Sequence, residues 1–157
     1  MIIVGIISRG SGVTIDLIER PDKQNAHALS LEFGPGRADF DGVSQLLMLA
    51  PGSYRLTGQY KGEIEGRRGL QWRVTCAGGE GAPLAESSMF LGMAPTWTEF
   101  AVAFTVPDAD CRAQELRLVL AARSASEQLV SGSIWYDELR VVRTDQPAES
   151  KLTPSRP

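Results

Sequence analysis

Residue types on which many enzyme and metal sites depend are scarce in this chain of 157 residues. It has one histidine, His27, and two cysteines, Cys76 and Cys111. A Ser–His–Asp triad would have to use His27, which lies in a turn-rich stretch without a nucleophile motif. Two cysteines and one histidine are too few for a tetrahedral zinc site. The sequence therefore predicts no catalytic residues, and we expect the protein not to be an enzyme.

The sequence also lacks an excess of positive charge and a long apolar run. Sixteen basic and 19 acidic residues give a net charge of −3, which disfavours nucleic acid or an anionic membrane as a partner. The apolar segment from Met1 to Ile7 is far shorter than a membrane-spanning helix. It has neither the basic flank nor the cleavage site of a signal peptide. We expect no nucleic-acid binding and no membrane insertion. The segment itself is expected to be a first strand or the trimmed edge of a longer protein.

Cys76 and Cys111 leave two interpretations open. In an oxidising compartment the pair would form a disulfide, whereas in the cytosol both would be buried, unreactive thiols. The sequence does not decide between them, because it does not place the two Cα atoms within bridging distance.

Short segments in which apolar and polar residues alternate are abundant. Alternation of this kind is typical of strands with one buried face, and 16 glycines and 9 prolines suit tight turns between them. Residues 1–143 are predicted to form one all-β domain, an antiparallel β-sandwich of the jelly-roll type. The polar, proline-rich residues 144–157 are predicted to form a disordered tail. The expected strands are 12–18, 29–33, 43–49, 54–60, 72–76, a short one within 84–91, 100–106, 115–122 and 132–142.

Residues 113–128 admit a second interpretation. Alanine, glutamine, glutamate, leucine and arginine, all good helix formers, dominate this stretch. The alternation of Leu116, Leu118 and Leu120 favours a strand, and the alanine-rich continuation is either a short helix or a long loop.

Two of the expected strands, 54–60 and 72–76, are joined by a short polar loop and are predicted to form a hairpin. Their outward side chains would then form one polar and basic surface that could bind sugar hydroxyls or the carboxylates of an acidic polysaccharide. Trp97, Tyr136, Phe90 and Tyr60 are the candidate stacking surfaces beside it, whereas Trp72 and Trp135 are expected in the core. The alternative is a solvated sheet face without a ligand. The predicted ligand-binding residues are Arg55, Thr57, Gln59, Lys61, Gln71, Arg73 and Trp97.

The segment 132–142 combines a strand pattern with a carboxylate. Alternation places Trp135, Asp137, Leu139 and Val141 on one face, which we expect to be buried. A carboxylate on a buried face requires a charge partner, a metal ion or several hydrogen-bond donors. Asp137 is therefore a candidate site residue.

An ordered set of short motifs resembles the carbohydrate-binding modules that have a galactose-binding-like jelly roll. A proline–glycine turn precedes a strand with tyrosine and leucine, a tryptophan-led strand ends in Phe-Thr-Val-Pro, and a terminal strand carries Ile-Trp-Tyr-Asp-Glu-Leu. The segment Asn/Asp-Gly-Phe-Glu that usually opens the family is absent. The motifs lie at residues 28–33, 51–60, 97–100, 104–107, 116–120 and 134–139.

The resemblance implies a non-catalytic accessory domain that binds carbohydrate in the periplasm or outside a bacterial cell. It implies further that Asp137 is a ligand of a structural calcium ion. Calcium needs six to eight oxygen ligands, and Glu32, Asp16 and Glu19 are the candidate partners. A looser similarity is to C-terminal domains of bacterial tetratricopeptide-repeat proteins.

A structural or protein-interaction domain of a larger protein is the alternative function. Its best support is the segment 84–97, where Met89, Phe90, Leu91 and Met93 would form an exposed apolar patch. If these side chains are buried within the domain, the interface loses this support.

Overall fold

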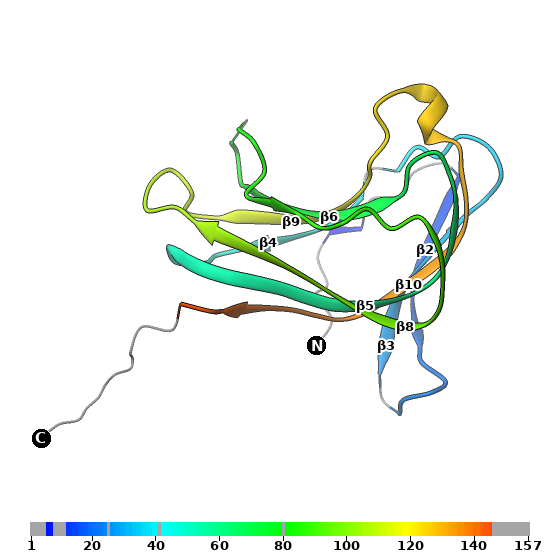
Figure 1. Cartoon of the computed structure of the whole chain (residues 1–157), viewed down its shortest axis with the longest axis horizontal. Coiled ribbons are helices and arrows are strands. Elements are labelled where there is room, and N and C mark those ends of the chain that lie inside the picture. Colours follow the sequence, from blue (N-terminus) through cyan, green and yellow to red (C-terminus); the bar gives the residue numbers. More distant parts are fainter. Residues whose placement is uncertain (1–5, 8–11, 25, 41, 80, 146–157) are drawn as a thin grey trace, which may run out of the picture.

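The computed structural model describes residues 6–7, 12–24, 26–40, 42–79 and 81–145. In this part of the chain ten strands form two antiparallel sheets, and one short 3-10 helix lies outside them. One sheet has the order β1-β4-β9-β6-β7 and the other the order β2-β3-β10-β5-β8. Figure 1 shows the layer of β4, β6 and β9 lying over β5, β8 and β10. The prediction of an antiparallel β-sandwich is confirmed. The strands are β1 (Ile6–Ile7), β2 (Val13–Glu19), β3 (His27–Phe33), β4 (Val43–Leu47), β5 (Gly52–Gly66), β6 (Leu70–Cys76), β7 (Ala85–Glu86), β8 (Gly92–Val106), β9 (Gln114–Leu120) and β10 (Val130–Arg143), and the helix is η1 (Ala125–Gln128).

The core lies between the two sheets and is built from every second residue of their strands. Leu116 and Leu118 of β9 are fully buried, as are Leu56 of β5 and Ile134 of β10. The Leu116–Leu120 alternation thus marks a strand, and the stretch that follows it contains the short helix η1. At one end of the core Tyr136 contacts the rings of Trp72, Tyr60 and Phe100. Trp72 is a core residue, as predicted from its aliphatic neighbours.

The predicted hairpin of residues 54–60 and 72–76 is wrong, because β5 and β6 belong to different sheets. β5 runs on to Gly66, through the expected loop, and pairs with β8 and β10, whereas β6 pairs with β7 and β9. Alternation reveals a strand but not its partner, and β5 finds longer partners in β8 and β10 than β6 offers. The outward residues of β5 and β6 therefore lie on opposite outer faces of the sandwich. The single polar surface expected from them does not exist.

Asp137 and Leu139 are buried as predicted, but Trp135 is not in the core, because a β-bulge interrupts the alternation of β10. Ile134 and Tyr136 point into the core, and Trp135 and Asp137 point to the outer side of the sheet. The register with β5 then shifts between Asp137 and Arg140, where Glu138 has a φ of 56°. This extra residue turns Leu139 inward. Two apolar sets of opposite phase thus share one strand, and strict alternation assigns Trp135 to the wrong face.

Gly58 of β5 makes room for the inward turn of the bulge. A Cβ atom at this position would lie 2.7 Å from both Leu139 Cδ2 and Phe100 Cε1. Only glycine lets these two side chains meet above the β5 backbone.

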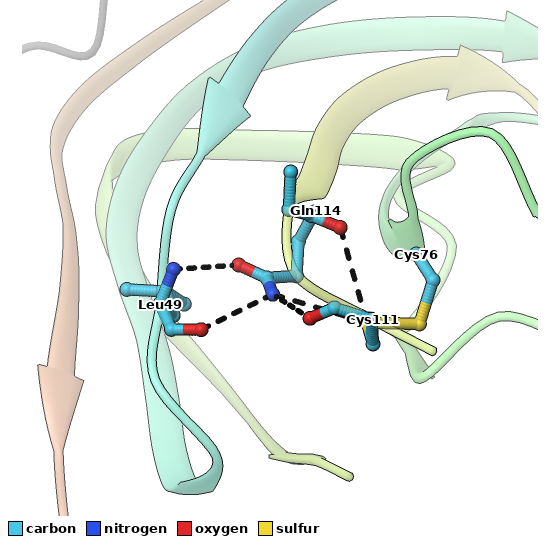
Figure 2. Close-up of a disulfide and its surroundings, with 5 residues drawn as sticks. Leu49, Cys76, Cys111 and Gln114 are labelled. Carbon is cyan, nitrogen blue, oxygen red and sulfur yellow. Dashed lines mark hydrogen bonds between the residues drawn. A yellow bond between two sulfur atoms is a disulfide. The ribbon is translucent and has the colours of Figure 1, made fainter. Parts of the chain in front are cut away.

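One end of the sandwich is held by a disulfide and a buried glutamine (Figure 2). Cys76 at the end of β6 is bonded to Cys111 in the loop before β9, with their Cα atoms 5.1 Å apart. Gln114 is fully buried; its Oε1 accepts a hydrogen bond from Leu49 N at 2.9 Å, and its Nε2 donates to Cys111 O at 2.9 Å. The side chain thus joins the segment after β4 to the disulfide loop.

The ends of the chain are described only in part. Ile6 and Ile7 form a short strand paired with β4, and the other residues of the expected first strand lie outside the described residues. Thr144 donates its backbone N–H to Ser53 O, and Asp145 pairs with Arg143. Residues 146–157 of the predicted tail also lie outside the described part. None of the helices that the structure describes has the length and apolar character needed to cross a membrane.

Candidate functional site

The two outer faces of the sandwich differ in how their polar side chains are used. On the face of β6 and β9, Arg73 pairs with Glu86 at 2.8 Å and Arg117 with Glu115 at 3.1 Å. Arg73 also donates to Gln71 Oε1. These charged groups pair with one another, as expected of a solvated sheet face. The predicted ligand-binding residues Gln71 and Arg73 therefore lie away from Arg55, Thr57, Gln59, Lys61 and Trp97.

The opposite outer face, formed by β2, β3, β10, β5 and β8, carries three hollows that follow one another along β5. The first, of about 610 Å³, is lined by residues that include Arg55, Thr57 and Gln59. The second, of about 280 Å³, and the third, of about 480 Å³, share Lys61 and Trp135. From Arg55 to Glu63 the row spans roughly 26 Å at about 3.3 Å per residue. We call this row the β5 groove.

The middle hollow is the most apolar of the three, and we call it the tryptophan pocket. Both tryptophans come from outward positions, Trp135 on β10 and Trp97 at the bulge where β8 passes Lys61. Trp135 Nε1 donates to Ser30 Oγ at 3.1 Å, which fixes its ring across β3. The pocket is lined by Ile18, Arg20, Pro21, Asp22, Ala28, Lys61, Trp97 and Trp135.

Arg20, immediately after β2, ties this region together. Its guanidinium donates to both carboxylate oxygens of Asp22 and, at 2.7 Å, to Asp137 Oδ2. Its Cζ lies 4.0 Å from the centre of the Trp97 ring, a cation–π distance. The hydrogen bonds to Asp22 and Asp137 raise the pKa of Arg20, and the bond from Arg20 lowers the pKa of Asp22. The arginine therefore stays charged and holds one face of Trp97.

Asp137 is buried, as the sequence indicated, and its charge partner is Arg20. The side chains of both are almost inaccessible, 4% exposed for Asp137 and 7% for Arg20. Asp137 Oδ1 also accepts the backbone N–H of Glu138 inside the bulge. An aspartate that receives a guanidinium and a backbone N–H needs no metal ion to be stable.

The structure does not bring Asp137 and Glu32 together. Glu32 pairs in register with Ser133, four residues along β10 from Asp137, which is roughly 13 Å. Within the described residues no group of three or more histidine, cysteine or acidic side chains is arranged to hold a metal ion. The geometry gives calcium no support at Asp137.

Glu138 lies beside the first hollow. Its carboxylate accepts hydrogen bonds from Lys23 Nζ at 2.7 Å and Arg140 Nη2 at 2.9 Å, and the Lys23 ammonium lowers the pKa of Glu138. Glu138 has a positive φ, which is costly for a non-glycine residue, and such strained residues cluster at functional sites. The bulge thus directs a charged residue toward the groove.

The segment 84–97 has a divided role. Phe90 packs against Tyr60 in the core, with ring centres 4.7 Å apart, whereas Leu91 and Met93 are exposed. Met93 lines the third hollow of the β5 groove. The apolar patch expected to support a protein interface is therefore partly core and partly groove wall.

Sequence reasoning missed two residues of this site, Arg20 and Trp135. Trp135 was assigned to the core because the bulge reverses the phase of β10. Nothing near Arg20 in the sequence points to Asp137, since 117 residues separate them. The buried carboxylate was the available signal, because its presence demanded a cationic partner somewhere in the chain.

Comparison with known proteins shows which solved structures share this fold. No family model and no curated protein matches the chain. Among solved structures, the carbohydrate-binding module in "CBM4 structure and function" superposes with a TM-score of 0.59 at 14% identity, over 85% of this chain and 79% of that one. The xylan-binding domain CBM22-2 of Paenibacillus barcinonensis Xyn10C has a TM-score of 0.55 at 9% identity, over 87% and 91%.

A third solved structure is TmCBM61 in complex with β-1,4-galactotriose, with a TM-score of 0.53 at 17% identity over 87% and 86% of the two chains. The chain therefore has the β-sandwich fold of carbohydrate-binding modules, and the predicted resemblance is confirmed at that level. Identities this low show the fold alone.

Proposed function

We propose that this protein is a non-catalytic domain that binds a glycan chain in the β5 groove. The observation that carries the proposal is the tryptophan pocket at the middle of a row of polar hollows. Sugars bind proteins by stacking their C–H faces on aromatic rings while side chains hydrogen-bond their hydroxyls. Trp97 and Trp135 supply the rings, and Gln59, Thr57 and Lys61 supply hydrogen-bonding groups along the same strand.

A neutral glycan fits the groove better than an acidic polysaccharide. The acidic ligand was expected from a joint surface of Arg55, Lys61 and Arg73, and Arg73 lies on the other sheet. Positive and negative side chains are balanced around the three hollows, so the groove has no excess charge to attract a polyanion. The lining basic residues are Arg20, Lys23, Arg55, Lys61 and Arg140, and the acidic ones are Asp22, Glu63, Glu65, Glu99 and Glu138.

The disulfide supports a location of the protein outside the cytosol. Disulfides persist in oxidising compartments and are rare in the cytosol. The bond between Cys76 and Cys111 is therefore consistent with a domain that meets polysaccharides in the periplasm or outside the cell.

Affinity electrophoresis tests the glycan proposal. Native gels that contain xylan, glucomannan, β-1,4-galactan or polygalacturonate are expected to retard the protein with at least one neutral polymer. Trp135→Ala should weaken binding roughly thirtyfold, since the loss of a tryptophan anchor costs about 2 kcal/mol. Gln59→Ala should weaken it about fivefold, as expected for one hydrogen bond of about 1 kcal/mol.

Gln71→Ala is the matched control, because Gln71 is the same residue type on the opposite outer face. It should leave retardation unchanged. Equal effects of Gln59→Ala and Gln71→Ala would remove the β5 groove as the site, and the absence of retardation by any polymer would overturn the proposed function. Circular dichroism of each variant checks that the fold is retained.

A further inference from the structure

The tryptophan pocket differs from the hollows on either side of it in what it can bind. Its walls are largely apolar, since Ile18, Pro21, Ala28 and the two tryptophans line it. At about 280 Å³ it is smaller than the usual ligand site of about 300–1,000 Å³. It therefore suits one substituent or one ring rather than a length of chain.

Most polar atoms at the pocket are already engaged. All three nitrogens of the Arg20 guanidinium donate to carboxylates, Nε and Nη2 to Asp22 and Nη1 to Asp137. Trp135 Nε1 donates to Ser30. Lys61 is different, because its ammonium forms no ion pair or hydrogen bond with the described residues and lies 5.7 Å from the centre of the Trp135 ring. The pocket thus offers an apolar surface and the unpaired ammonium of Lys61.

We propose that the tryptophan pocket recognises an O-acetyl group on the bound glycan. The methyl group would lie against the apolar walls between the tryptophans, and the ester carbonyl would accept a hydrogen bond from Lys61 Nζ. This inference rests on the proposed function, since the sugar that carries the ester must lie in the β5 groove. The inference adds to that function the chemical class of the glycan, which is acetylated.

Beneath a sugar ring that stacks on the tryptophans, a free hydroxyl fits the pocket less well than an acetyl group. A hydroxyl is both donor and acceptor, and one buried without a partner loses binding energy. An O-acetyl group has one acceptor carbonyl and no donor, which matches the polar groups that remain.

Paired polymers test the proposal. Acetylated xylan and acetylated glucomannan are compared, by isothermal titration calorimetry, with the same samples after mild alkaline removal of the esters. The acetylated form of the bound polymer should bind about tenfold more tightly, from one buried methyl group and one hydrogen bond.

Two variants locate the effect in the pocket. Ala28→Val narrows the floor, because Ala28 is 1% exposed and lines the cavity, and Lys61→Met removes the donor at similar length. Either change should bring the affinity ratio of acetylated to deacetylated polymer toward one. Ala103→Val, on the exposed outer side of β8, is the matched control and should keep the ratio.

A small probe tests the pocket without a polymer. In ¹⁵N-labelled protein, methyl tetra-O-acetyl-β-glucopyranoside should shift the indole N–H signals of Trp97 and Trp135 but not that of Trp72 in the core. Methyl β-glucopyranoside should shift them much less. The three indole signals are assigned by single Trp→Phe variants.

The outcomes separate the two proposals. Equal affinity for acetylated and deacetylated polymer, or equal indole shifts with both glucosides, would overturn acetyl recognition and leave glycan binding intact. Indole shifts with the acetylated glucoside, without binding of any polymer, would support an acyl pocket and overturn the glycan-binding function. If no polymer binds and the acetylated glucoside shifts no indole signal, both proposals are overturned.

Discussion

Replacing Arg20 by methionine is expected to lower the free energy of unfolding by about 3 kcal/mol. The change leaves the Asp137 carboxylate buried with only the Glu138 backbone N–H as its donor. Removing one partner of a buried ion pair costs about 3–5 kcal/mol, and the lower end applies because Asp22, the second partner of Arg20, is half exposed. Urea denaturation followed by circular dichroism measures the difference at pH 7.

Arg123→Met is the matched control for this variant. Arg123 pairs with Glu127 at 2.8 Å, as Arg20 pairs with Asp22, but its side chain is 71% exposed. Exposed pairs contribute little to stability, so this variant should unfold like the wild type. A similar loss in both variants, or none in Arg20→Met, would contradict the assignment of Arg20 to the buried network.

The pH dependence provides a second readout of the same variant. Arg20 lowers the pKa of Asp22 from its ordinary value of 3.8, so this pair stabilises the fold above pH 3.8. The contribution is lost as the pH falls through the lowered pKa of the folded state. The stability difference between wild type and Arg20→Met should therefore shrink below about pH 4.

Removing the disulfide by the double change Cys76→Ser and Cys111→Ser is expected to cost roughly 3–4 kcal/mol. The bond closes a loop whose ends are 35 residues apart in the sequence, and in the chain-entropy treatment a loop of this length gives roughly that value. Urea denaturation of the variant and of the oxidised wild type measures the loss. Wild-type protein kept reduced should unfold like the double variant.

Thiol titration is the control for the disulfide prediction. The unfolded, unreduced wild type should contain no reactive thiol, and reduction should release two. Two thiols before reduction, or an unchanged urea midpoint in the double variant, would contradict the bond as a stabilising element.

The strands of this fold could be predicted because their signal is local. Each is short enough for alternation to place its residues, as with Leu116 and Leu118, and turns such as Pro51-Gly52 separate them. The partners of the strands could not be predicted in the same way. Residues 62–66 have the composition of a polar loop, yet they extend β5 because β10 is long enough to pair with them.

The candidate site was predicted only in part for the same reason. The predicted residues Gln59, Lys61 and Trp97 do lie on one face, whereas the prediction of Gln71 and Arg73 depended on a sheet pairing that does not occur. Trp135 depended on the phase of β10, which one residue in a left-handed conformation, Glu138, reverses. The alternation of apolar and polar residues does not reveal a bulge, because an extra residue changes which side chains face inward without changing the sequence pattern before it.

Asp137 illustrates what a sequence can and cannot supply. The buried carboxylate was recognised as a residue in need of a partner, and a calcium ion was the partner that the resemblance implied. The structure provides Arg20 from the other end of the chain. A buried charge can thus be foreseen from the strand that carries it, but the side chain that neutralises it depends on the tertiary fold.

Chemical-shift mapping of the glycan-bound protein tests most directly whether the β5 groove is the binding face. A ¹⁵N-labelled sample is titrated with oligosaccharides of the neutral polymer that gives the strongest retardation in native gels. We predict that the shifted backbone amides cluster at residues 55–63 of β5, 97–101 of β8 and 133–140 of β10, and that the indole N–H signals of Trp97 and Trp135 shift with them. Shifts centred instead on β6 and β9, around Gln71 and Arg117, would contradict binding in the β5 groove.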